Sequence, residues 1–252
     1  LALFLLTAMA PWLHGTWAAA RFPALCLSPG AACLLWFTRG VWRHPARALA
    51  ASILASALLA PATLFLLLRT LGNPDRALLP YSLLWGLLLA AAYLRKHGSL
   101  RVPTEWRSSW RDLLFLAAAS LLIALPLFLN RDLRLRSDAW THIALVREIL
   151  HGRFPWTDPR FAGEPLRYFW FFNLWSAGFS ARGGIGYPEG LALANLAGLL
   201  AYAASVVAVA QRFFPGRAGR AAAIGVAFAG LNPLGLLAFP GKLATGLIGE
   251  TR

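Results

Sequence analysis

Long apolar runs alternate with short charged segments along the whole chain. Most of these runs come close to the about 20 residues that a helix needs to cross a hydrocarbon core about 30 Å thick. The pattern therefore predicts an all-α, polytopic bundle of transmembrane helices. The weakest run is 23–38, because Pro29 and Gly30 interrupt it. The candidate spans are 1–19, 23–38, 47–69, 79–95, 112–130, 188–211 and 220–239.

The apolar stretch 168–181 has a different length from the spans. It is only fourteen residues long, which is too short for a comfortable crossing. We favour a re-entrant or interfacial helix there over a further span. Its aromatic side chains suit the headgroup zone, where amphipathic rings settle. These are Tyr168, Trp170 and Trp175.

Lysine and arginine gather in only some of the connections, and loops rich in these residues stay on the cytoplasmic side. Segment 70–78 holds a single arginine, beside Asp75. Placing the richer segments inside sends the 112–130 span outward, so loop 131–167 is expected on the outer face. Three segments hold at least three basic residues each: 39–47, 95–111 and 212–220.

Composition narrows the class of protein further. Hydrophobic residues make up 58% of the chain and charged residues 13%, whereas a soluble domain carries about a quarter charged residues. The net charge of +14 comes from arginines in short segments between apolar runs. That distribution fits contact with membrane lipid, and it lacks the basic stripe of a nucleic-acid surface. We therefore expect no nucleic-acid partner.

Loop 131–167 concentrates the acidic side chains of the chain. Its first part reads as a surface amphipathic helix from Ser137 to Leu150, capped by Ser137 or Asp138. An apolar stripe at three- and four-residue spacing favours the helix, and His151-Gly152 favours its end. The stripe comprises Trp140, Ile143, Val146 and Leu150, and the acids of the loop are Asp132, Asp138, Glu148, Asp158 and Glu164.

Asp138 and His142 are four residues apart, so both project from one face of this helix. The carboxylate can accept a proton from a hydroxyl while the imidazole steers or shares it. The two side chains can instead supply two ligands to a divalent metal whose shell is completed by phosphate oxygens. They can also serve only as a helix cap with a paired histidine. The spacing leaves these three alternatives open.

The order of motifs in this loop adds a resemblance. Asp138-x-x-x-His142 is followed by Gly-x-x-Pro-x-x-Asp-Pro ending at Pro159, and then by Ala-Gly-x-Pro-x-x-Tyr ending at Tyr168. It resembles the first outer loop of polytopic glycosyltransferases of the C-type fold (GT-C). It is closest to the bacterial and archaeal membrane proteins named for a Tyr-Tyr-Tyr motif, which here reads Tyr-Phe-Trp. The resemblance covers about residues 112–212.

The resemblance implies a membrane glycosyltransferase that uses a polyprenyl-phosphate-linked sugar donor at the outer face of a bacterial or archaeal plasma membrane. Asp138 would be the catalytic base or a metal-linked carboxylate with Mg²⁺ or Mn²⁺, with Asp158 and then His142 as further catalytic candidates. If both acids serve one reaction, they should open on one outward-facing cavity. The candidate substrate-binding residues are Arg136, Glu164, Arg167 and Tyr168.

The resemblance also suggests a division of the chain. Residues 1–111 would form N-terminal transmembrane helices, and residues 112–252 would form a glycosyltransferase-like membrane region that is truncated at its C-terminus. The alternative function is that of a non-catalytic polytopic membrane protein, such as a transporter of lipid-linked substrates or an assembly subunit. A transporter favours ionisable residues at mid-membrane depth. Here the acids lie mostly outside the spans, which favours chemistry at the membrane surface.

Overall fold

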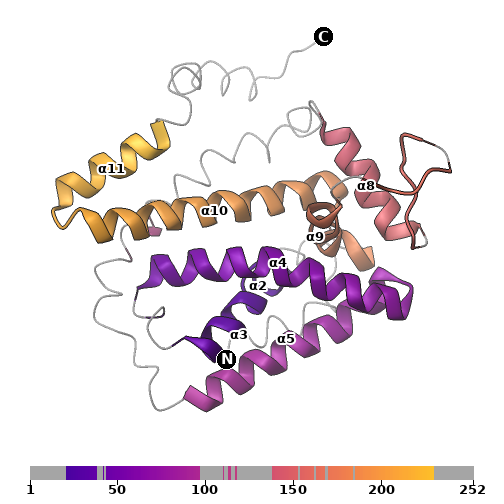
Figure 1. The fold of residues 1–252 in the computed structure, drawn as a ribbon, viewed down its shortest axis with the longest axis horizontal. Helices are drawn as coiled ribbons and strands as arrows, with labels where there is room; N and C mark the ends of the chain where they lie inside the picture. Colours follow the sequence, from indigo (N-terminus) through magenta and orange to yellow (C-terminus); the bar gives the residue numbers. More distant parts are fainter. Residues whose placement is uncertain are drawn as a thin grey trace, which may run out of the picture.

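The structure is a computed structural model, and α-helices form its architecture (Figure 1). The helices are α2 (Arg21–Cys26), α3 (Ser28–Phe37), α4 (Pro45–Leu71), α5 (Pro74–Lys96), α8 (Ala139–His151), α9 (Phe171–Ser180), α10 (Tyr187–Phe213) and α11 (Arg217–Ala229), with a 3-10 turn, η4 (Ala181–Gly183). Within the described residues, β-structure is limited to one isolated bridge. The all-α prediction is confirmed. The described residues are 21–38, 42, 44–96, 110, 113–114, 117, 138–152, 154–161, 163–167, 170–183 and 185–229.

Three helices are long and apolar enough to cross a membrane, namely α4, α5 and α10. They correspond to the predicted spans 47–69, 79–95 and 188–211, and they identify the chain as an integral membrane protein. Helix α11 covers the first part of the predicted span 220–239. The predicted span 1–19 and almost all of 112–130 lie outside the described residues.

The long helices lie side by side, and different elements meet at the two ends of the bundle (Figure 1). The start of α4 meets the last turns of α10, where Ala46 packs with Val207 and Ala210. Helices α8 and α9 lie at the opposite end (Figure 1). Arg47 at the start of α4, Arg95 at the end of α5 and Arg212 at the end of α10 lie toward the first of these ends. We call the end with α8 and α9 the α8–α9 end.

The charged residues of the long helices mark the limits of an apolar slab. Between them, the uncharged stretches of α4, α5 and α10 are about 33, 28 and 34 Å long at 1.5 Å per residue. Each length matches a hydrocarbon core of about 30 Å. The bounding residues are Arg47 and Arg69 on α4, Arg76 and Arg95 on α5, and Glu189 and Arg212 on α10.

The predicted span 23–38 is divided into α2 and α3, and Pro29 explains the break. Proline has no N–H, and its ring displaces the carbonyl of the residue four positions earlier, which is Leu25. That carbonyl accepts a hydrogen bond from the indole N–H of Trp175 at 3.1 Å. The expectation that Trp175 sits in the headgroup zone was therefore wrong, since its ring is buried inside the bundle.

Helices α3 and α4 cross with their backbones in contact. A Cβ atom on Gly30 would lie 2.0 Å from the carbonyl oxygen of Ser52, so only glycine fits at this position. The Gly30 N–H donates to the hydroxyl of Ser56 at 2.9 Å. Small residues of this kind allow close helix packing inside membranes.

Helix α9 is short, as expected for the stretch 168–181, and its ten residues are about 15 Å long. It crosses the long helices rather than running along them (Figure 1). Every residue from Asn173 to Ser180 is buried, so α9 is an interior helix, not an interfacial one.

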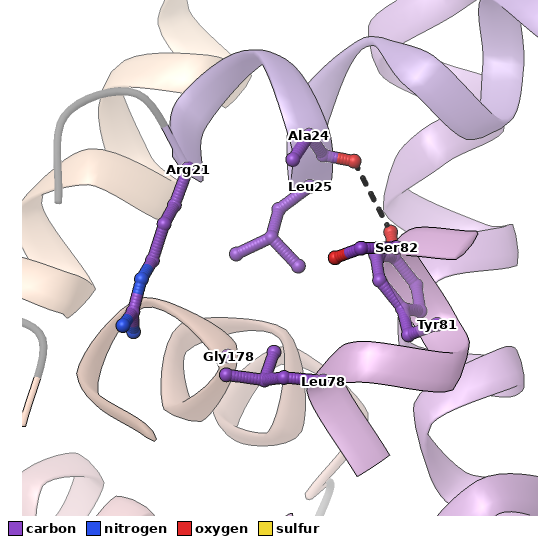
Figure 2. A pocket seen from close by; sticks show the side chains of 7 residues that line it. All are labelled: Arg21, Ala24, Leu25, Leu78, Tyr81, Ser82 and Gly178. Atoms are coloured by element: carbon purple, nitrogen blue, oxygen red, sulfur yellow. Dashed lines mark hydrogen bonds between the residues drawn. The ribbon is translucent and has the colours of Figure 1, made fainter. Parts of the chain in front are cut away.

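The C-terminal end of α9 is capped by a buried arginine. The Arg21 guanidinium donates to the carbonyl of Phe179 at 3.0 Å and to that of Ala181, and the side chain extends from α2 toward this turn (Figure 2). The carboxylate of Asp75, at the start of α5, accepts the N–H of Arg182. A small pocket beside Arg21 is lined mainly by Leu25, Leu78 and other apolar groups of α2, α5 and α9.

Candidate functional site

Helix α8 begins and ends where the sequence predicts. Asp138 is its N-cap residue and Gly152 its C-cap residue. The buried face consists of Leu145, Val146 and Ile149, so the predicted stripe is rotated. Trp140, expected to be part of that stripe, is 61% exposed.

His142 precedes this buried face by one turn and therefore points toward α9. Its Nδ1 lies 2.9 Å from Oδ1 of Asn173, and its ring packs edge-on against Phe172 with centroids 5.9 Å apart. Its Nε2 lies 3.4 Å from Oδ2 of Asp138. The side chain of Asp138 is 72% exposed and that of His142 22%, while Asn173 is fully buried. The side chains of these three residues form a row of polar contacts that leads from solvent to the interior.

This row of Asp138, His142 and Asn173 can hold and orient a proton. Both ring nitrogens of His142 face oxygen atoms. A neutral imidazole has one N–H to donate, and a protonated one has two. A proton accepted by Asp138 from a hydroxyl can therefore be shared with His142. The buried amide of Asn173 fixes the ring during this exchange.

Asp158 lies in a tight turn, and its carboxylate is already paired. Arg160 donates to it through Nε at 2.9 Å, through Nη2 at 2.7 Å and through its backbone N–H at 2.9 Å. These bonds lower the pKa of Asp158 to about 2. The side chain of Asp158 is 8% exposed. This carboxylate is suited to holding the turn rather than to accepting a proton.

Asp138 and the turn that holds Asp158 lie at opposite ends of α8. The turn with Asp158 is tied to the far end of α8, because Glu148 accepts hydrogen bonds from the backbone N–H and the hydroxyl of Thr157 at 3.2 and 2.8 Å. Ten residues of helix separate Asp138 from Glu148, a distance of about 15 Å. The expectation of a shared cavity is therefore not met. Among the described catalytic candidates, the side chains of Asp138 and His142 are brought together.

The remaining candidates are placed as follows. The side chains of Glu164 and Arg167 are exposed, and the backbone carbonyl of Glu164 accepts the N–H of Asp158 at 2.8 Å. Arg136 and Tyr168 lie outside the described residues. In the described part of the chain, no three His, Cys, Asp or Glu side chains gather to hold a metal ion. Asp138 could contribute one carboxylate, with His142 beside it.

Asn173 was not among the predicted site residues. Its signal was present, because it is a single amide within the aromatic run of α9. A buried amide requires a hydrogen-bond partner, and it finds one in His142. The missing information was the pairing of α8 with α9, which local sequence patterns do not specify.

A second feature of this end is a cluster of aromatic rings around Arg69. Phe65, Phe154, Trp156 and Trp170 contact one another, with ring centroids 4.8 to 6.5 Å apart. Arg69, in the last turn of α4, lies over the rings of Phe65 and Phe154. The cluster joins α4 to the loop that follows α8.

Comparison with protein-family models, with curated proteins and with solved structures finds no match to this chain.

Proposed function

We propose that this protein is a membrane glycosyltransferase that transfers a sugar from a polyprenyl-phosphate-linked donor to an acceptor hydroxyl. The observation that supports it most directly is the anchored pair of Asp138 and His142 at one end of the helix bundle. An exposed carboxylate held by a fixed imidazole is suited to general-base catalysis. The motif order of loop 131–167 supports the same reaction class.

In this mechanism the acceptor hydroxyl binds next to Asp138. Its oxygen attacks the anomeric carbon of the donor while its proton passes to the Asp138 carboxylate. The bond between the anomeric carbon and the phosphate oxygen breaks, and its electron pair leaves with the lipid phosphate. Attack from the face opposite the leaving group inverts the anomeric centre. His142 then shares the proton, and Asn173 keeps the imidazole oriented.

A divalent ion fits this site only in part. Mg²⁺ and Mn²⁺ are bound by one or two carboxylates together with substrate phosphates and water, and Asp138 offers one such carboxylate. When bound, the ion would neutralise charge on the leaving phosphate. The roles given above to Asp138, His142 and Asn173 rest on the contacts among these three side chains.

The orientation of the protein follows the positive-inside rule. The arginines that start or end the long helices, Arg47, Arg95 and Arg212, lie toward one end of the bundle, and α8 lies at the other (Figure 1). Since connections rich in arginine remain in the cytoplasm, α8 and the site would face the outer side of a bacterial or archaeal plasma membrane. A lipid-linked donor in the outer leaflet would reach the site from the apolar slab.

The test is transfer by the full protein in proteoliposomes with radiolabelled polyprenyl-phosphate sugars and a panel of hydroxyl acceptors. We expect Asp138→Asn to lower the initial rate by about 10²- to 10⁴-fold, because it removes the general base. The matched control is Asp75→Asn, at the same end of the bundle. Asp75 accepts a backbone N–H, which asparagine also accepts, so its rate should stay within about twofold of the wild type.

Equal rates for Asp138→Asn and the wild type would contradict the assignment of the base. A wild type that transfers none of the sugars would contradict the proposed reaction. That second result would favour a non-catalytic membrane protein.

A further inference from the structure

Arg69 lies at the depth of the lipid headgroups. It ends the uncharged stretch of α4, which begins after Arg47 and is about 33 Å long. On the neighbouring helix α5, Arg76 bounds the uncharged stretch at the same end of the bundle. An exposed arginine at this level meets the phosphates of the lipids.

The guanidinium of Arg69 is held by two rings from different parts of the chain. It lies 6.0 Å from the centroid of Phe65 on α4 and 5.9 Å from that of Phe154 in the loop after α8. The two rings meet edge-on at 5.5 Å. Among the described residues, no carboxylate or carbonyl accepts a hydrogen bond from Arg69. Within the described part of the chain, its N–H groups are thus available to a ligand.

We propose that Arg69 binds the phosphate head of a lipid. A guanidinium presents a planar fork of N–H donors that matches phosphate oxygens. The rings restrict its orientation before binding, which reduces the entropy lost when a ligand binds. The exposed ring of Phe154 and the partly exposed Trp170 offer an apolar surface to the first methylenes of the lipid chain, and the buried Trp156 packs behind them. This site stands independently of the proposed transfer.

The other end of the bundle supplies a matched control. Arg95 ends the uncharged stretch of α5, and its guanidinium lies 5.0 Å from the ring of Trp36. Arg95 is held by one ring rather than two, and Lys96 beside it offers a second cation. Removing Arg95 changes the net charge as removing Arg69 does, and leaves the aromatic cluster at the α8–α9 end unchanged.

The experiment is a native mass spectrometry titration of the detergent-solubilised full protein with three lipids. These are a polyprenyl phosphate, a phosphatidic acid and a neutral polyprenol. We expect Arg69→Gln to weaken binding of the phosphate lipids about tenfold or more, because a charge-assisted hydrogen bond is lost. Arg95→Gln should change it less than about threefold. Binding of the polyprenol should be the same in all variants.

If Arg69→Gln loses affinity for both phosphate lipids, the result supports a site that recognises the phosphate group whatever the lipid chain. Loss for the polyprenyl phosphate only supports the site and identifies its ligand as the lipid-linked source. Equal affinities for Arg69→Gln and Arg95→Gln would overturn the proposal. So would a polyprenol that binds the wild type as tightly as the polyprenyl phosphate does.

Two further variants separate this site from folding and from catalysis. Phe154→Leu keeps the charge and removes one ring, so it should weaken binding about two- to fivefold. Asp138→Asn should bind both phosphate lipids as the wild type does. A protein that binds lipid phosphate at Arg69 yet transfers no sugar would disprove the proposed reaction and leave this site intact.

Discussion

The crossing of α3 over α4 and the α8–α9 end both join helices of the bundle, yet they are stabilised by opposite kinds of contact. At the crossing, Gly30 brings two backbones together, and its N–H donates to the small side chain of Ser56. At the α8–α9 end, polar and aromatic side chains join the helices to one another. The stability of the crossing therefore depends on Gly30 having no side chain, and that of the α8–α9 end depends on particular polar and aromatic groups.

This difference predicts how each region responds to substitution. The crossing should reject any added atom, because its neighbours are backbone atoms that cannot move aside. The α8–α9 end should tolerate changes of volume better than the loss of a donor or acceptor, since a buried polar group left without a partner is costly. Three variants test the contrast.

Gly30→Ala should have the largest effect. Its Cβ would lie 2.0 Å from the carbonyl oxygen of Ser52, so α3 and α4 must separate, and we expect the free energy of unfolding to fall by about 3 kcal/mol. Unfolding in mixed micelles with increasing SDS measures it. Gly198→Ala on α10 is the control, because nothing lies within 4 Å of the added Cβ. Similar losses for the two variants would show that the crossing is not tightly packed.

Arg21→Met should have an intermediate effect. Methionine keeps much of the side-chain volume and removes the donors to the carbonyls of Phe179 and Ala181. We expect a loss of about 2 kcal/mol in the same assay, since hydrogen bonds to charged groups contribute about 1.5–3 kcal/mol. The exposed Arg76→Met, at the same end of the bundle, should change stability by less than about 0.5 kcal/mol. A neutral Arg21→Met would mean that desolvation of the guanidinium cancels its hydrogen bonds.

Asp158→Asn should have the smallest effect, confined to the turn after α8. Arg160 lowers the pKa of Asp158 from 3.8 to about 2, so its stabilisation is present above about pH 4 and is lost as the pH falls to about 2. Pepsin, which is active over this range, should cleave near the exposed Phe154 and Phe161 increasingly as the pH falls. Asp158→Asn should be cleaved already at pH 4.

Glu164→Gln is the control for that experiment, because it removes an exposed carboxylate from the same turn. Its cleavage should follow the wild type at each pH. Parallel profiles for all three proteins would show that the ion pair of Asp158 does not hold the turn.

The long helices could be predicted because each is an uncharged run with charged residues at both ends. Helix α8 could be predicted from its cap and its C-terminal glycine, and Asp138 with His142 from their spacing. These signals are local in the sequence. The short length of α9 followed from its run of residues in the same way.

The features that could not be predicted depend on contacts between distant segments. Trp175 was expected at the membrane surface because amphipathic rings settle in the headgroup zone, but its indole N–H is paired inside the bundle with the carbonyl of Leu25. Asp158 was ranked as a candidate catalytic acid because its motif places it in the outer loop. Its pairing with Arg160 depends on the conformation of the turn, which the motif does not encode.

The bond between Trp175 and Leu25 also has a consequence for biosynthesis. The two residues are 150 positions apart, and a ribosome that adds about 5–20 residues per second needs about 8–30 s to make the intervening chain. Throughout that interval the carbonyl freed by Pro29 lacks its final partner. Helices α2 and α3 therefore wait for α9 before the break between them can settle, so this part of the bundle matures only after α9 has been translated.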